Sequence, residues 1–142
     1  MKDQNIISLN ANDAIFNANT TDFLGIKNMS LTPYLVTEGH YIDHGVLKNV
    51  GNAINNKVFT NTYLSDELLI GRGKGTIETT DGQSIDWISS DLGRQGDNQW
   101  IFYGVMLFNN THSESLSFLN NRIGLYKSTS DVNEPEYIWL LE

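Results

Sequence analysis

The chain has 142 residues and a mass of 16.0 kDa, the size of one ordinary domain, and no shift in composition marks a second core or a linker. Hydrophobic residues make up 39% of it, so we expect a single folded domain over residues 1–142, with residues 1–33 the least clearly assigned. A net charge of -8 disfavours nucleic acid and anionic membranes as partners, and the lack of cysteine excludes disulfides, thiol catalysis and thiolate metal ligands.

No segment is expected to enter a membrane. The first residues include no apolar stretch of signal-peptide length, which predicts a cytoplasmic protein. The longest apolar run, from Trp100 to Phe108, contains Gly104 and is less than half as long as the roughly 20 residues that a membrane-spanning helix needs.

The pattern along the chain predicts short β-strands. Segments rich in β-branched and aromatic residues alternate with clusters of Gly, Asn, Asp and Ser, which is typical of an antiparallel meander. Weaker strands are expected at 14–17, 31–37 and 40–47. Clearer strands are expected at 57–64, 67–80, 84–90, 99–108, 115–119, 122–128 and 137–141.

The strongest local signal is a hairpin. Asp81-Gly82 is a residue pair that tolerates positive φ, so it predicts a two-residue turn joining strand 67–80 to strand 84–90. Such a turn would place Arg72 opposite Asp91 and Glu78 opposite Ile85.

Glycine spacing then favours a closed barrel. Gly71, Gly73 and Gly75 alternate, so all three lie on one face of a strand, where they permit sharp coiling or close approach of a neighbour. Closure is also the complete way for seven or eight short strands to remove their edges. We therefore predict an all-β fold, a closed antiparallel eight-stranded barrel, with a β-sandwich as the alternative.

These residues carry a resemblance to a known family. The run from Gly71 to Gly82 is followed by Trp87, Gly93-Arg94, Tyr103-Gly104, Leu116 to Asn120, Gly124 and Trp139. This spacing, over residues 34–142, resembles small prokaryotic proteins of the allene oxide cyclase-like barrel superfamily, which also contains the dirigent proteins. The resemblance implies an eight-stranded antiparallel barrel that forms homo-oligomers and holds an apolar ligand. The chain departs from the pattern at Asn121, where a glycine is expected, and at Asn133-Glu134-Pro135, and the catalytic glutamate of the cyclases has no counterpart in it.

Local motifs suggest no metal, no cofactor and no hydrolase triad. Glu38, His40 and His44 have suitable chemistry for a metal, but on a strand positions four apart lie about 13 Å from each other, too far to share one ion. Gly71 to Thr76 lacks the Lys-Ser/Thr step and the following helix of a phosphate-binding loop.

Glu78 is the one weak catalytic candidate. Inside an apolar barrel its carboxyl could act as a general base, whereas on the surface it would simply be solvated. In the expected register Asp86 lies on the opposite face of the hairpin, so the two carboxyls would not cooperate.

The segment Trp100 to Phe108 is apolar on both strand faces, so its outer face needs a cover from the N-terminal segment or from another subunit. The inner face would line either a dry core or a ligand cavity. For a cavity, the expected ligand-binding side chains are Trp87, Tyr103, Tyr126 and Trp139. If the core is dry, Trp87 and Trp139 pack against each other.

Three functions remain open at this point. The first is a binding module for a small apolar or aromatic molecule, the second a cyclase or isomerase acting on an unsaturated apolar substrate, and the third an interaction protein with a filled barrel. A filled lumen would support the third, an empty apolar lumen the first, and an apolar lumen with a buried carboxyl the second.

Overall fold

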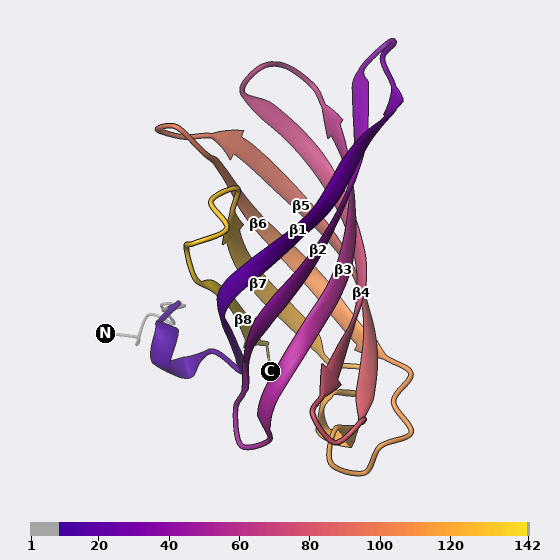
Figure 1. Cartoon of the computed structure of the whole chain (residues 1–142), viewed down its shortest axis with the longest axis vertical. Helices are drawn as coiled ribbons and strands as arrows, with labels where there is room; N and C mark the ends of the chain where they lie inside the picture. The colour runs from indigo at the N-terminus through magenta and orange to yellow at the C-terminus, as the bar shows by residue number, and fades with distance from the viewer. Residues whose placement is uncertain (1–8, 142) are drawn as a thin grey trace, which may run out of the picture.

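The computed structural model describes residues 9–141 and contains one closed antiparallel β-barrel (Figure 1). Its eight strands follow one another around the barrel in chain order. They are β1 (Phe16–Ser30), β2 (Leu35–Leu47), β3 (Gly51–Tyr63), β4 (Leu68–Thr79), β5 (Ser84–Gln95), β6 (Trp100–Asn109), β7 (Ile123–Thr129) and β8 (Glu136–Leu140). Two short 3₁₀ helices, η1 (Ala11–Asp13) and η2 (Ser117–Leu119), lie outside the strands. The expected all-β barrel is therefore confirmed, and the sandwich is not formed.

The β4–β5 hairpin forms as expected, but its turn is longer than the two residues predicted. The Thr79 N–H donates to the carbonyl of Gln83, so the loop is Thr80-Asp81-Gly82, and only Gly82 has a positive φ, of 85°. A loop of this length needs the left-handed conformation at one position, which the glycine supplies.

This extra loop residue shifts the pairing of β4 and β5 by one position. Arg72 lies opposite Ser90, and Glu78 lies opposite Ser84, so both expected pairings are wrong. Asp91 lies opposite Gly71 on the inward face of the barrel. Because side chains alternate along a strand, a slip of one position changes which residues of the two strands share a face, and here Trp87 and Asp91 share the inner face with Gly75 and Gly71.

Strand β1 was only partly predicted. It is far longer than the expected segment 14–17, and its pairing with β2 is interrupted by irregularities after Ala18, Phe23 and Asn28. Bulges of this kind bend a strand and change which residue faces inward, so the strand shows no period of two in its sequence.

The expected strand at 115–119 is wrong. This segment forms a turn and η2, and its Leu116 and Leu119 are fully buried. Figure 1 shows η2 at the lower end of the barrel, where these leucines join the core. The lower lumen is filled with large apolar side chains, and the fully buried ones include Phe16, Leu47, Ile77, Ile85 and Phe108.

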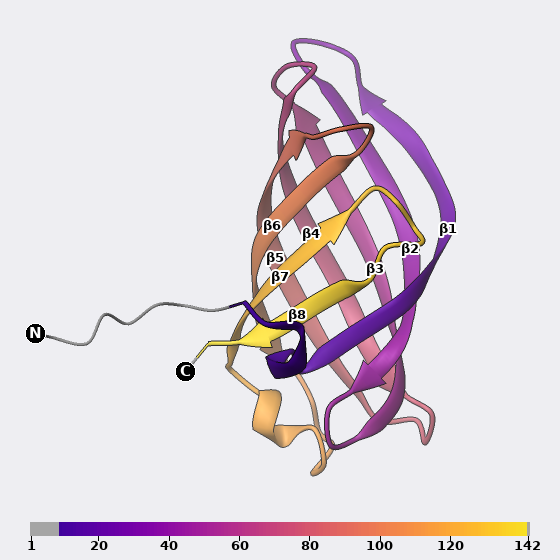
Figure 2. The ribbon, with the colours of Figure 1, turned by 90° about the vertical axis from the view of Figure 1, so that its left-hand side faces the viewer.

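The barrel is closed by a short seam. Strand β1 pairs with β8 only through Phe16, Asn17 and Ala18, and its remaining residues pair with β2 alone. Figure 2 shows β1 continuing upward past the short β8 and the β7–β8 connection. The wall of the barrel is therefore lower on this side than elsewhere.

Part of the outer surface is apolar and uncovered. Tyr103 and Val105 on β6 are about half exposed, and Leu92 on β5 is 67% exposed. The described N-terminal residues lie elsewhere, against Trp139, whose Nε1 donates to the carbonyl oxygen of Asn10 over 2.8 Å. The N-terminal cover expected for β6 is thus not formed by residues 9–15. Within residues 9–141 no helix is long and apolar enough to cross a membrane.

Candidate functional site

The upper half of the lumen holds a cavity of about 430 Å³. It lies above the filled core, toward the end of the barrel that carries the β1–β2, β3–β4 and β5–β6 connections. These connections are at the top of the barrel in Figures 1 and 2. Its wall includes Phe23 and Ile26 from β1, and residues 128–132 and Glu134 from β7 and the β7–β8 connection. These two segments border the side on which β1 and β8 part, so the cavity adjoins the low wall.

Aromatic rings form much of the cavity wall. The lining rings are those of Phe23, Tyr41, Phe59, Tyr63, Trp100 and Phe102. Several pack on one another: the ring centroids of Phe23 and Tyr41 are 5.4 Å apart, and those of Tyr63 and Trp100 are 5.5 Å apart. The rings therefore support each other and leave the space between them apolar.

A buried lysine borders this cavity. The Lys57 ammonium nitrogen lies 2.7 Å from Asp43 Oδ2 and 2.6 Å from each carboxylate oxygen of Glu136. Thr21 Oγ1 donates to the other oxygen of Asp43 over 2.6 Å. The three charged groups come from β2, β3 and β8, so the cluster ties the first strands to the last one.

Two carboxyls share this one ammonium group, and their pKa values are driven apart. Burial raises the pKa of Glu136 to about 8, because Lys57 only partly offsets desolvation and the nearby Asp43 carboxylate adds to the rise. Burial alone would raise the pKa of Asp43. The charge of Lys57 and the hydrogen bonds from Lys57, Glu136 and Thr21 outweigh this effect, so the pKa of Asp43 lies below its ordinary value. Near neutral pH the cluster therefore holds an ionised Asp43, a charged Lys57 and a largely protonated Glu136.

Asp91 is a second buried acid in the same lumen. Its side chain lines the cavity and the residue is only 5% exposed. Oδ2 accepts a hydrogen bond from the hydroxyl of Tyr126, whereas Oδ1 is buried and has no hydrogen-bond partner among the described residues. Burial raises the pKa of Asp91 above its usual range, against the opposing effects of Tyr126 and Lys57.

Two glycines make room for this arrangement. A Cβ at Gly71 would collide with the side chains of Asp91 and Asn61, and a Cβ at Gly104 would collide with the ring of Tyr126. Glycine at both positions thus lets the acid and the phenol meet inside the barrel.

Of the expected ligand-binding residues, the structure brings one to the cavity region. Tyr126 faces inward and holds Asp91. Trp87 also faces inward, but it belongs to the packed core below the cavity, where its Nε1 donates to Asn55 Oδ1 over 2.8 Å. Tyr103 is on the outer face, and Trp139 is on the outside beneath η1, so placing these two in the lumen is wrong, as is packing Trp139 on Trp87.

Glu78 lies on the outer surface as well. It is exposed, and no interaction of its carboxyl with the lumen is possible from there. With the shifted register Asp86 is exposed on the same outer face, not on the opposite one, and its Oδ1 accepts from Thr76 Oγ1. Among residues 9–141, the carboxyls buried inside the barrel belong to Asp43, Asp91 and Glu136.

Sequence reasoning missed these three acids for identifiable reasons. The two-residue turn pairs Asp91 with Arg72, whereas in the structure Asp91 lies opposite the inward-facing Gly71. For Asp43 the available local signal is its alternation with Tyr41 and Gly45, which places it on one face of the strand with them. Glu136 pairs with Ala18, a contact between the two ends of the chain that no local pattern reveals.

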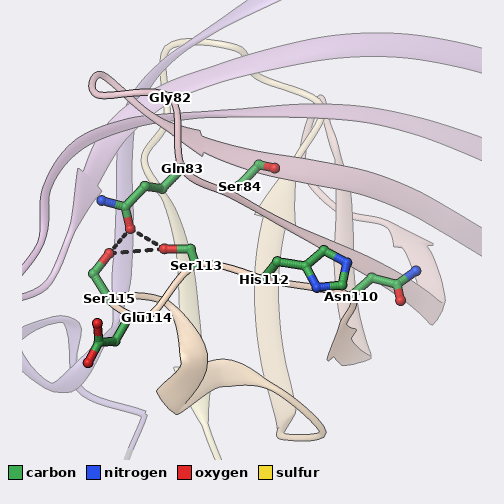
Figure 3. Close-up of a pocket in the computed structure, with 8 residues that line it drawn as sticks. All are labelled: Gly82, Gln83, Ser84, Asn110, His112, Ser113, Glu114 and Ser115. Carbon is green, nitrogen blue, oxygen red and sulfur yellow. Dashed lines mark hydrogen bonds between the residues drawn. The ribbon is translucent and has the colours of Figure 1, made fainter.

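Another depression lies at the opposite end of the barrel. It is formed by the β4–β5 turn and the β6–β7 connection and is lined by Gly82, Gln83, Ser84, Asn110, His112, Ser113, Glu114 and Ser115 (Figure 3). Gln83 Oε1 accepts hydrogen bonds from the hydroxyls of Ser113 and Ser115, while His112 points away from both (Figure 3). No serine here is paired with the histidine, so this depression lacks the arrangement of an activated nucleophile.

The histidines expected not to bind metal are in separate surface contacts. His40 lies 3.5 Å from Glu38, and His44 Nε2 lies 2.7 Å from Asp22 Oδ2. Among residues 9–141 no group of three or more His, Cys, Asp or Glu side chains is placed to hold a metal ion.

Comparison of the chain with protein-family models, with curated proteins and with solved structures gave no significant match.

Proposed function

We propose that the upper lumen is a binding site for a small aromatic or apolar molecule, and that the protein is a binding module of the allene oxide cyclase-like kind. The observation that carries the proposal is a cavity of about 430 Å³ walled by aromatic rings, above a core that is already filled. Cavities of this size and lining are typical of sites for small organic ligands. The closed eight-stranded antiparallel barrel agrees with the family resemblance.

A matched pair of substitutions tests this site. Ser128 is buried and lines the cavity, whereas Ser90 is exposed on the outer face of β5. Ser128→Phe should occupy the cavity, and Ser90→Phe should leave it free. We expect the neutral dye N-phenyl-1-naphthylamine to bind the wild type and Ser90→Phe with a rise in fluorescence, and to bind Ser128→Phe weakly. Equal fluorescence without any rise in all three proteins would refute the proposal.

The natural ligand can be sought directly. The purified protein should be measured by native mass spectrometry and then extracted under denaturing conditions, and Ser128→Phe should yield less of any co-purifying molecule than Ser90→Phe.

A second candidate function is an enzyme of the cyclase or isomerase type. The observation in its favour is that Asp91 and Glu136, both with raised pKa, line an apolar cavity, as proton-transferring carboxyls do. The two functions can be distinguished by comparing the small molecules that are extracted from purified wild type and purified Asp91→Asn. A binding module yields the same molecule from both, in different amounts, whereas an enzyme blocked in proton transfer yields a chemically different molecule.

A further inference from the structure

The charges around the cavity are unbalanced. Among the described lining residues the acids are Asp91, Asp131, Glu134 and Glu136, and the one base is Lys57. Lys57 is already paired with Glu136 and with Asp43 behind it. The cavity therefore offers an organic anion no free cation, while it offers several carboxyl groups to a ligand that carries positive charge.

Some of these acids lie at the rim of the cavity and others lie inside the barrel. Asp131 and Glu134 are exposed in the β7–β8 connection at the rim, where they contribute a negative potential that attracts cations toward the opening. Asp91 lies inside, with one oxygen held by Tyr126 and the other unpartnered. A buried acceptor without a donor is unfavourable, and a ligand that supplies an N–H removes that penalty.

The wall of the cavity suits the same ligand. The faces of aromatic rings attract cations, and the effect grows when water is excluded. This lumen already shows the effect, because Lys57 Nζ lies 5.4 Å from the centroid of Phe59 and 6.0 Å from that of Tyr41. Phe102 and Trp100 extend the aromatic surface around the free part of the cavity.

We propose that the ligand is a small organic cation, an aromatic or alkyl amine in its protonated form, whose ammonium N–H donates to Asp91 Oδ1 while its apolar part lies among Phe59, Trp100 and Phe102. This assignment rests on the proposed binding function and narrows its ligand class. An ammonium group beside Asp91 favours the ionised carboxylate and so offsets the effect of burial on that acid. The hydroxyl of Tyr126 holds Oδ2, while Oδ1 lies beside Gly71 and near the side chain of Asn61, a residue of the cavity wall.

Three probes that share one ring system test the charge preference. 1-Naphthylmethylamine is cationic at neutral pH, 1-naphthylmethanol is neutral, and 1-naphthoate is anionic. Their dissociation constants can be measured by displacement of N-phenyl-1-naphthylamine and by calorimetry. We expect the dissociation constant of 1-naphthylmethylamine for the wild type to be at least about tenfold lower than that of 1-naphthylmethanol, because the amine makes a charge-assisted hydrogen bond to a buried acceptor. We expect 1-naphthoate to bind most weakly of the three.

Substitutions then assign the preference to Asp91. Asp91→Asn should abolish the advantage of the amine and leave the affinity for the alcohol within about twofold, because the apolar wall is unchanged. Asp86→Asn, an exposed acid on the same strand, should keep the full preference. Tyr126→Phe is a second variant that leaves Asp91 in place and frees its other oxygen, so it should retain the preference. Retained alcohol binding shows that each variant is folded.

The outcomes distinguish this inference from the proposed function. Equal affinity of wild type for amine and alcohol would overturn the cation assignment and leave the binding function intact. A preference that Asp91→Asn does not change, and that disappears at high salt, would place it in the rim acids and overturn the role of Asp91, because a buried pair is screened little. Failure of all three probes and of the dye to bind would overturn the binding function itself.

Discussion

Replacing Lys57 by methionine should destabilise the barrel strongly. The substitution keeps the length of the side chain but removes the ammonium group, whose nitrogen lies 2.6 Å from the carboxyl group of Glu136 and 2.7 Å from the carboxylate of Asp43. Asp43 is fully buried and would be left with the hydroxyl of Thr21 and the carboxyl of Glu136 as hydrogen-bond donors, neither of which carries a positive charge. Loss of one partner of a buried ion pair costs about 3 to 5 kcal/mol, because the other charge stays desolvated, and we expect a loss of unfolding free energy in this range at neutral pH.

The effect should depend on pH in a defined direction. Glu136 already holds its proton up to about pH 8, so the uncompensated charge in the variant is that of Asp43. Without the ammonium group the pKa of Asp43 rises, and acidification protonates it. The stability difference between wild type and Lys57→Met should therefore shrink as the pH falls, since the wild type loses the ion pair and the variant loses the penalty.

Denaturant unfolding followed by tryptophan fluorescence measures this loss. Lys74→Met is the matched control, because Lys74 is exposed on the outer face of the neighbouring strand β4, and it should change stability little. The double variant Lys57→Met, Asp43→Asn removes the stranded charge and should recover most of the loss. A cost below about 1 kcal/mol for Lys57→Met, or no recovery in the double variant, would refute the reasoning.

Further predictions concern Glu136, the hairpin turn, the core and the outer surface. Folding raises the pKa of Glu136 to about 8, so the native protein binds more protons than the unfolded chain from about pH 5 to about pH 8. The unfolding free energy should therefore fall as the pH rises through this range, by up to about 1.4 kcal/mol per pH unit. Glu136→Gln should flatten this slope in denaturant titrations. Gly82→Val should cost about 1 to 3 kcal/mol because φ is 85°, whereas Gly82→Asn should cost less; equal stability of both variants and wild type would contradict the turn. Trp87→Ala should lower stability by about 3 to 5 kcal/mol, as for other buried aromatic residues, and a loss under about 1 kcal/mol would mean that the lower lumen is not packed. The exposed Leu92 lies on an apolar outer face, so we predict a homo-oligomer that Leu92→Glu dissociates; light scattering that gives 16.0 kDa for wild type at micromolar concentration would contradict it.

Local sequence determined much of the barrel. Alternating β-branched and aromatic segments and polar turns predicted β3 to β8 to within a few residues at most ends, because these signals act between neighbours in the chain. Gly82 correctly predicted the position of the β4–β5 turn, because a backbone position with positive φ favours glycine. The alternating Gly71, Gly73 and Gly75 predicted a strand face with close approach, and a Cβ at each of the three would collide with a neighbouring side chain inside the barrel.

Only the tertiary structure decided which face is inside and what meets there. One loop residue more than expected changed the partner of every paired residue of β5 and brought Asp91 opposite the inward-facing Gly71 instead of Arg72. Lys57, Asp43 and Glu136 come from three strands, and Glu136 reaches the others through the β1–β8 seam that joins the ends of the chain. When both faces of a strand are apolar, the alternation of its side chains does not tell which face points into the barrel. Pairing between distant segments also depends on the register of every strand between them. The positions of most strands could therefore be predicted from the sequence, whereas the meeting of the charged side chains at the cavity follows only from closure of the barrel.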